Sequence, residues 1–122
     1  MALLLYHYPR CSTSRKGKKW LEEHGITFTE IDISKNPPDK ETLRAYWKKS
    51  GLPLLRFFNT SGQLYRSMGL KDKLPTMDDE EKLTLLSEHG MLLKRPLISD
   101  GEKVTVGFDE ETFARTWKSA SE

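Results

Sequence analysis

Cys11 is the only cysteine of the 122-residue chain, and its surroundings favour a reactive thiol. It follows an apolar run that ends at Pro9 and precedes a segment with helical spacing. At a helix start, unpaired N–H groups and the helix dipole favour the anionic form of a side chain placed there. Arg10, Arg15 and Lys16 add positive charge nearby. We therefore predict that Cys11 is largely thiolate and acts as a nucleophile; the alternative is a buried, inert small hydrophobe.

Ser14 lies three residues after Cys11, in a Cys-x-x-Ser spacing. One helical turn brings its hydroxyl back over the sulfur, where it can hydrogen-bond a thiolate but cannot resolve a mixed disulfide. A second thiol must then come from outside the chain. The alternative for Ser14 is a first-turn cap with no chemical task.

The segments that must position Cys11 alternate between strand and helix. Leu3–His7 is a short apolar run that predicts a buried strand. Thr13–His24 carries apolar residues at helical spacing and stops at Gly25, and Thr27–Ile33 returns to a β-rich pattern. The three segments predict a βαβ unit with a right-handed crossover, and therefore two neighbouring parallel strands.

Residues 37–90 are predicted to form a helical insert without strands. Asp39 can cap a helix that closes at Gly51, and a second helical segment covers residues 54–58. Thr76 is predicted to begin a further helix that ends at Gly90.

The β pattern returns after the insert. Leu97–Ser99, a turn at Asp100–Gly101 and Lys103–Val106 predict a hairpin. A last helix follows Asp109, and residues 119–122 read as a loose tail.

The order βαβ, insert, ββα predicts an α/β protein with a central mixed sheet and the element order of thioredoxin and glutaredoxin. We expect one thioredoxin-like domain over residues 1–122, with residues 1–36 and 91–118 as its core and residues 37–90 as the insert. In such a fold the Arg95–Pro96 loop faces the cysteine through a cis-proline, Pro96, and Arg95 points toward Cys11 and an anionic ligand.

Bulk composition narrows the function further. The net charge is only +2, from 20 basic and 18 acidic residues, so the chain lacks the large excess of positive charge that direct nucleic-acid binding needs. The first residues lack the features of a signal peptide, and no membrane segment is expected. A single thiol fits a reducing compartment, so we expect a cytoplasmic protein. A single cysteine also excludes a metal site built on cysteines, and we expect no bound cofactor.

Four segments together resemble the arsenate reductase and Spx family, over nearly the whole chain. They are the sequence around Cys11–Ser14, Arg56–Arg66, Gly90–Leu97 and Val106–Phe108. Members of that family are thioredoxin-like with a helical insert.

In the glutaredoxin-coupled arsenate reductases of the family, the cysteine attacks arsenate and three arginines hold the oxyanion. The resemblance implies that Cys11 is the nucleophile and that Arg95 and Arg66 bind the anion. Read by itself, Arg66 is a surface arginine. Gly107 stands where the third arginine should lie, which removes one charge-assisted partner of a doubly charged oxyanion.

The other branches of the family imply different functions. Spx proteins are regulators that bind RNA polymerase, usually with a Cys-x-x-Cys switch that Ser14 makes impossible here. Arsenate-reductase-like proteins with one cysteine resemble glutaredoxins and fit best. We therefore expect a thiol oxidoreductase whose Cys11 adduct is resolved by glutathione, another low-molecular-weight thiol, or a glutaredoxin- or thioredoxin-type protein. The alternative is a regulator that binds RNA polymerase without catalysis.

Overall fold

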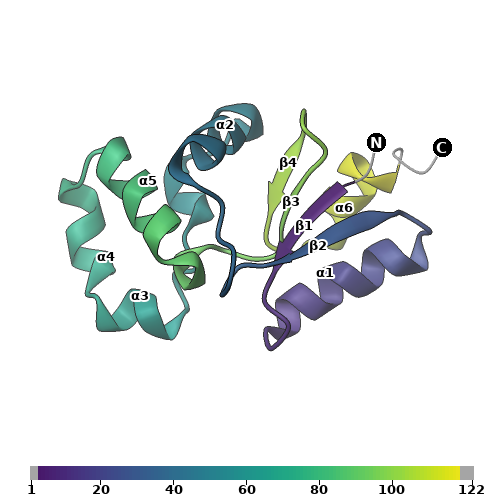
Figure 1. The fold of residues 1–122 in the computed structure, drawn as a ribbon, viewed down its shortest axis with the longest axis horizontal. Helices are drawn as coiled ribbons and strands as arrows, with labels where there is room; N and C mark the ends of the chain where they lie inside the picture. Colours follow the sequence, from purple (N-terminus) through teal and green to yellow (C-terminus); the bar gives the residue numbers. More distant parts are fainter. Residues whose placement is uncertain (1–2, 119–122) are drawn as a thin grey trace.

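A four-stranded mixed sheet lies at the centre of the computed structural model, which describes residues 3–118 (Figure 1). The strand order is β2-β1-β3-β4. β1 (Leu3–His7) pairs in parallel with β2 (Phe28–Asp32) and antiparallel with β3 (Leu97–Ser99), which pairs antiparallel with β4 (Val104–Val106). The predicted α/β class and mixed sheet are confirmed; the tail predicted at 119–122 lies outside the described residues.

Two helices cover one face of the sheet. α1 (Ser12–Glu23) connects the parallel strands, and α6 (Glu110–Thr116) follows β4 with Asp109 as its N-cap. They share a buried apolar cluster with the sheet: Leu3, Leu5, Trp20, Leu21, Ile26, Ile98, Phe113 and Trp117. This packing fixes the start of α1, and with it Cys11, against the end of β1.

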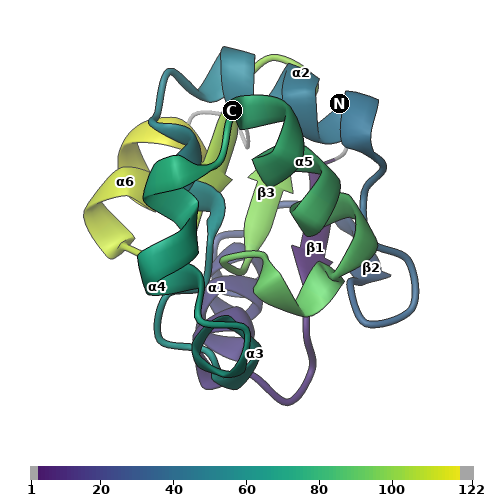
Figure 2. The ribbon, with the colours of Figure 1, turned by 90° about the vertical axis from the view of Figure 1, so that its left-hand side faces the viewer.

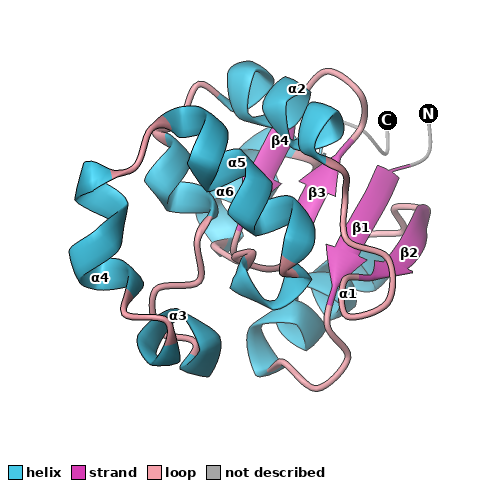
Figure 3. Ribbon diagram, turned by 60° about the vertical axis from the view of Figure 1, so that its left-hand side comes forward, coloured by secondary structure: helices cyan, strands magenta, loops and turns pink. Residues whose placement is uncertain are grey.

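The insert covers the opposite face of the sheet (Figure 3). Its α-helices are α2 (Lys40–Ser50), α3 (Gln63–Ser67), α4 (Leu70–Lys73) and α5 (Asp79–Glu88), and short 3-10 turns span 54–57, 74–76 and 90–92. A hydrogen bond of 3.0 Å between the buried Tyr6 and Tyr46 hydroxyls joins β1 to α2. The segment contains no strand, as expected, apart from an isolated backbone bridge between Phe58 and Leu93.

The caps of α2 agree with the prediction, whereas the start of α5 differs. Asp39 accepts from the Thr42 N–H, and Gly51 ends α2 with φ of +69°. Thr76, the predicted start, lies in a 3-10 turn. α5 begins after Asp78 instead, because Asp78 forms a capping box with Glu81.

The C-terminal end of α5 and two further helices also differ from the prediction. α5 ends at Glu88, and Gly90 opens a 3-10 turn. A Cβ at Gly90 would collide with the Ile33 carbonyl, so this close approach explains the glycine. α3 and α4 were not predicted. Together with α5 they face the viewer in Figure 2.

Gly17 lets the Arg95–Pro96 loop pack directly on α1. A Cβ at Gly17 would lie 2.6 Å from Pro96 Cγ. We expect Gly17→Ala to lower the free energy of unfolding by about 1–2 kcal/mol, because overpacking costs more than the gain in helix propensity. Denaturant titration measures this change. Lys19 is exposed on the same helix, so Lys19→Ala serves as the control and should change the free energy of unfolding by less than about 0.5 kcal/mol. An equal change in both variants would contradict the packing argument.

Candidate active site

Cys11 is the N-cap residue of α1 and is partly buried. Its extended backbone (φ −86°, ψ 123°) lets the carbonyl accept from the Arg15 N–H. Burial raises the pKa of Cys11. Hydrogen bonds from the Ser14 N–H, the Arg95 side chain, the Ser14 hydroxyl and the Thr13 N–H outweigh burial, so the pKa lies below the ordinary thiol value.

Ser14 is fully buried in the first turn of α1. Its Oγ accepts a hydrogen bond from the Tyr8 N–H at 3.2 Å. Since that contact uses a lone pair, the hydroxyl proton is left for the sulfur, and this hydrogen bond lowers the pKa of Cys11. The position is thus both a structural link to the end of β1 and a neighbour of the reactive atom.

Two of the predicted basic neighbours of Cys11 in sequence point into solvent. Arg10 and Arg15 are exposed, and Arg15 Nη1 donates to the Pro9 carbonyl at 3.2 Å. Neither is among the groups that lower the pKa of Cys11. Their supporting role stays a prediction that rests on charge acting through solvent, where salt screens it.

Arg95 is the cation that lowers the pKa of Cys11. The Arg95–Pro96 bond is cis, as predicted. The guanidinium lies over the Tyr8 ring, 5.3 Å from its centroid, and Nη1 donates to the Met91 carbonyl at 3.1 Å. Arg95 Nε is buried and has no hydrogen-bond partner among the described residues. Two contacts therefore orient the side chain and leave donor capacity for a ligand.

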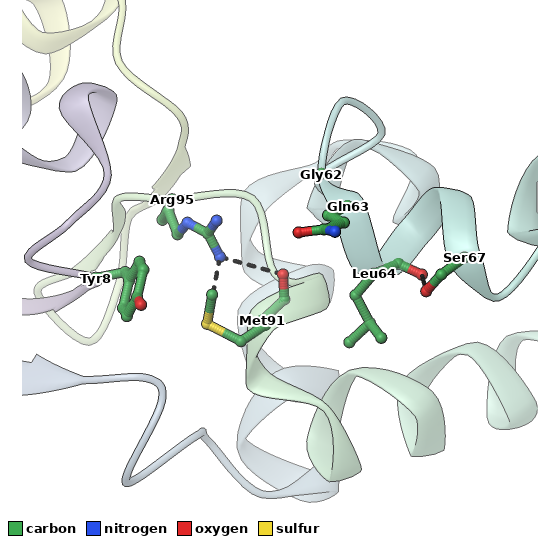
Figure 4. A pocket seen from close by; sticks show the side chains of 7 residues that line it. All are labelled: Tyr8, Gly62, Gln63, Leu64, Ser67, Met91 and Arg95. Carbon is green, nitrogen blue, oxygen red and sulfur yellow. Dashed lines mark hydrogen bonds between the residues drawn. The ribbon is translucent and has the colours of Figure 1, made fainter.

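A cavity of about 580 Å³ opens beside Arg95 (Figure 4). It lies between the loop before β3 and α3. Its lining residues are Tyr8, Gly62, Gln63, Leu64, Ser67, Met91 and Arg95. Of these, only Arg95 was predicted as a site residue; three of the other six belong to α3, which was not predicted.

Arg66 and Gly107 do not line the cavity beside Arg95. Arg66 is an exposed residue of α3 and does not line this cavity, whereas Gln63 and Ser67 of the same helix do. Gly107 lines a separate cavity of about 470 Å³ beside β4. Its φ is +80°, and a Cβ there would lie 2.9 Å from Lys94 Cε. Anion binding by Arg66 stays a prediction.

Within residues 3–118, no helix is long and apolar enough to cross a membrane. The same residues contain no group of three or more His, Cys, Asp or Glu side chains that could hold a metal ion.

The hydrogen bonds to Cys11 predict a shifted alkylation profile. Because its pKa is lowered, the thiolate should persist at pH values where an ordinary thiol is protonated. The iodoacetamide rate plotted against pH should therefore inflect below about 8.5, the unperturbed thiol value. Free cysteine, measured in parallel, gives the reference. An inflection at or above the reference would show that the thiol is not activated.

Comparison with known proteins places this geometry in a family. The ArsC family matches residues 6–116. "Uncharacterized protein YusI" of Bacillus subtilis is 57% identical over 96% of this chain and 99% of its own length. An arsenate reductase of Neisseria meningitidis is 34% identical over 84% of this chain and 87% of its own length.

A regulator and a solved structure are similar as well. The global transcriptional regulator Spx of Enterococcus faecalis is 32% identical over 93% of this chain and 84% of its own length. The crystal structure of an ArsC family related protein from Bacteroides fragilis superposes with a TM-score of 0.91, at 45% identity over 94% of this chain and 97% of that one. The thioredoxin-like fold and the resemblance to arsenate reductases and Spx are thereby confirmed, and the chain belongs to the ArsC family.

Proposed function

We propose that the chain is a cytoplasmic thiol-dependent oxidoreductase with Cys11 as its nucleophile. The observation that carries this proposal is the position of Cys11 as the N-cap of α1, the helix on which the cis Arg95–Pro96 loop packs. The Ser14 N–H, the Arg95 guanidinium and the Ser14 hydroxyl all stabilise the thiolate. Thiolate is the form that attacks disulfides and other electrophiles.

The reaction is a thiol–disulfide exchange in two steps. The Cys11 thiolate attacks one sulfur of a disulfide R–S–S–R′; a new Cys11–S bond forms, the S–S bond breaks, and R′–S⁻ leaves. Cys11 is the only cysteine of the chain, so an external thiolate must attack the adduct, release R as a disulfide and restore Cys11. A low-molecular-weight thiol such as glutathione, or a glutaredoxin- or thioredoxin-type protein, supplies it.

Turnover assays test the proposal directly. The protein is incubated with arsenate, or with the mixed disulfide of glutathione and 2-mercaptoethanol, in each case with glutathione, glutathione reductase and NADPH. NADPH consumption above the protein-free rate with either substrate is the expected result. No turnover in either assay, from protein that iodoacetamide still alkylates at Cys11, would refute it.

Arsenate is the weaker substrate in this proposal because of Gly107. Removing preorganised positive charge from a developing anion is costly, and this chain has glycine where the resemblance places an arginine. We expect Gly107→Arg to raise arsenate turnover. The positive φ and the Lys94 side chain oppose any Cβ there, so Gly107→Ala is the matched control for strain. Efficient native arsenate turnover, equal in Gly107→Arg, would show that the third arginine is irrelevant.

Similarity to Spx supports a second candidate, a regulator without catalysis. The Enterococcus faecalis Spx protein aligns with 93% of this chain. A regulator of this kind would bind RNA polymerase equally well as wild type and as Cys11→Ser, and would show no turnover. Polymerase capture by Cys11→Ser, together with absent turnover by the native protein, would favour the regulator over the enzyme.

A further inference from the structure

We propose that the free edge of β4 binds an extended, acidic peptide segment of a partner protein as an additional strand of the sheet. Among the strands in residues 3–118, β4 pairs with β3 alone and is therefore an edge strand (Figure 1). The cavity of about 470 Å³ that Gly107 lines runs along this edge, and we call it the β4 groove. Cys11 does not line it, so binding there is separate from the thiol chemistry.

The pairing register turns part of the β4 backbone outward. The Gly107 N–H donates to the Pro96 carbonyl at 3.0 Å, which marks that pair as hydrogen-bonded. Because hydrogen-bonded and non-hydrogen-bonded pairs alternate in an antiparallel ladder, Thr105 bonds toward β3. Val104 and Val106 then direct their N–H and C=O groups away from β3, and no other part of the described chain bonds to those groups. Such an edge is a template for a further strand.

Two walls flank this edge and leave it open between them. Val104 packs into the apolar cluster on the insert side of the sheet, and Thr105 accepts a hydrogen bond from Trp117 Nε1 on the α6 side at 3.1 Å. Both faces of β4 are therefore covered, and only its edge opens into the groove. The insert supplies one wall, and α6 with its cap supplies the other: Ser50, Leu52 and Arg56, and Asp109, Thr112, Arg115 and Thr116.

Each wall carries one arginine whose guanidinium has donors to spare. The Arg56 side chain makes no hydrogen bond or ion pair within residues 3–118, and Arg115 Nη2 donates to Thr112 Oγ1 at 3.4 Å. The carboxylate of the lining set, Asp109, already accepts from the Thr112 N–H and hydroxyl at 3.2 and 2.6 Å. The groove therefore favours an occupant that brings carboxylates of its own.

An extended segment with neighbouring acidic residues matches this arrangement. Consecutive side chains of a strand point to opposite faces, so two adjacent acidic residues direct one carboxylate toward each wall. A second copy of this chain is a poor occupant, because pairing of β4 with β4 would bring Arg56 and Arg115 of two molecules together.

Peptide titration followed by amide NMR of the full chain tests the proposal. The probe is acetyl-Thr-Val-Glu-Glu-Val-Thr-amide. One control peptide replaces both glutamates by glutamine, and a second keeps the glutamates but carries N-methyl groups on both of their nitrogens. N-methylation blocks the strand pairing, whichever glutamate faces β4, and leaves the protein unchanged. We expect the probe to shift the Val104 and Val106 amide signals and to bind at least about tenfold more tightly than either control.

Variants assign the charge contribution. Arg56→Ala and Arg115→Ala should each weaken binding of the probe by about threefold, whereas Lys71→Ala, at an exposed position outside the groove, should match wild type. Cys11→Ser should also bind as wild type, which keeps this result apart from any failure of the thiol chemistry.

Three outcomes would overturn the proposal. They are equal binding of the probe and either control peptide, signal shifts that leave β4 unaffected, and no binding at about 1 mM peptide. Protection of the Val104 and Val106 amides that rises with protein concentration, without peptide, would assign the edge to a second copy of the chain instead.

Discussion

Cys11→Ser should abolish turnover with every disulfide or arsenate couple, whereas Ser14→Ala should only reduce it. A serine hydroxyl at position 11 is not ionised near neutral pH and cannot form the sulfur adduct that both steps require. Ser14→Ala removes one hydrogen bond to the thiolate, so we expect the pKa of Cys11 to rise and turnover at pH 7 to fall by about tenfold. NADPH-coupled turnover and the alkylation profile measure the two effects.

The pH dependence distinguishes the two variants. At about pH 9.5 an unperturbed thiol is already ionised, so Ser14→Ala should recover most of its alkylation rate there, while Cys11→Ser stays inert. Ser14→Ala also leaves the Tyr8 N–H without its partner, and urea titration is needed to show that the variant remains folded. Turnover retained by Cys11→Ser would remove Cys11 from the mechanism altogether.

The strands and the longer helices could be predicted because their signals are local. Asp39 and Gly51 mark both ends of α2, and the apolar run of β1 is followed directly by α1. α3 and α4 lack such signals: Gly62 and Gly69 precede them without a side-chain cap, and the helices have only five and four residues. Helices this short depend on tertiary burial, here of Tyr65 and Leu70.

The candidate site was predictable only where position in the fold decides it. Cys11 and Pro96 follow from the element order, because a strand-to-helix junction and the loop before the third strand meet at one end of the sheet. The source of positive charge was predictable in part. Arg95 was expected to point toward Cys11, and it is among the groups that lower the pKa of Cys11. Arg10 and Arg15 lie close in sequence but are exposed and are not among those groups, because sequence spacing does not specify side-chain direction.

The cavity beside Arg95 lies between distant segments. Tyr8, the α3 residues and Met91 become neighbours only when the insert packs against the sheet. None of them was predicted as a site residue. The position of the nucleophile is therefore a local feature of the sequence, while the cavity exists only through the packing of the insert.

Arg95→Met should combine two separable losses, of thiolate stabilisation and of anion binding. Among the groups of residues 3–118 that lower the pKa of Cys11, Arg95 is the one cation, so the pKa should rise without it. At pH 7 we expect adduct formation with glutathione disulfide, measured by intact-protein mass spectrometry, to slow by at least about thirtyfold, from a raised pKa together with the loss of the guanidinium fork. Arg95→Lys should lie between Arg95→Met and wild type, because it keeps the charge and loses the fork.

Raising the pH separates the two losses. At about pH 9.5 the thiolate is restored in all variants, so the rate with neutral bis(2-hydroxyethyl) disulfide should return to within about twofold of wild type. The rate with glutathione disulfide should stay low, because no guanidinium receives its carboxylate. Arg115→Met, an exposed arginine outside the Arg95 cavity, is the control and should follow wild type throughout. Full recovery of both rates at high pH would mean that Arg95 acts only on the thiol and that the ligand's anionic group binds elsewhere.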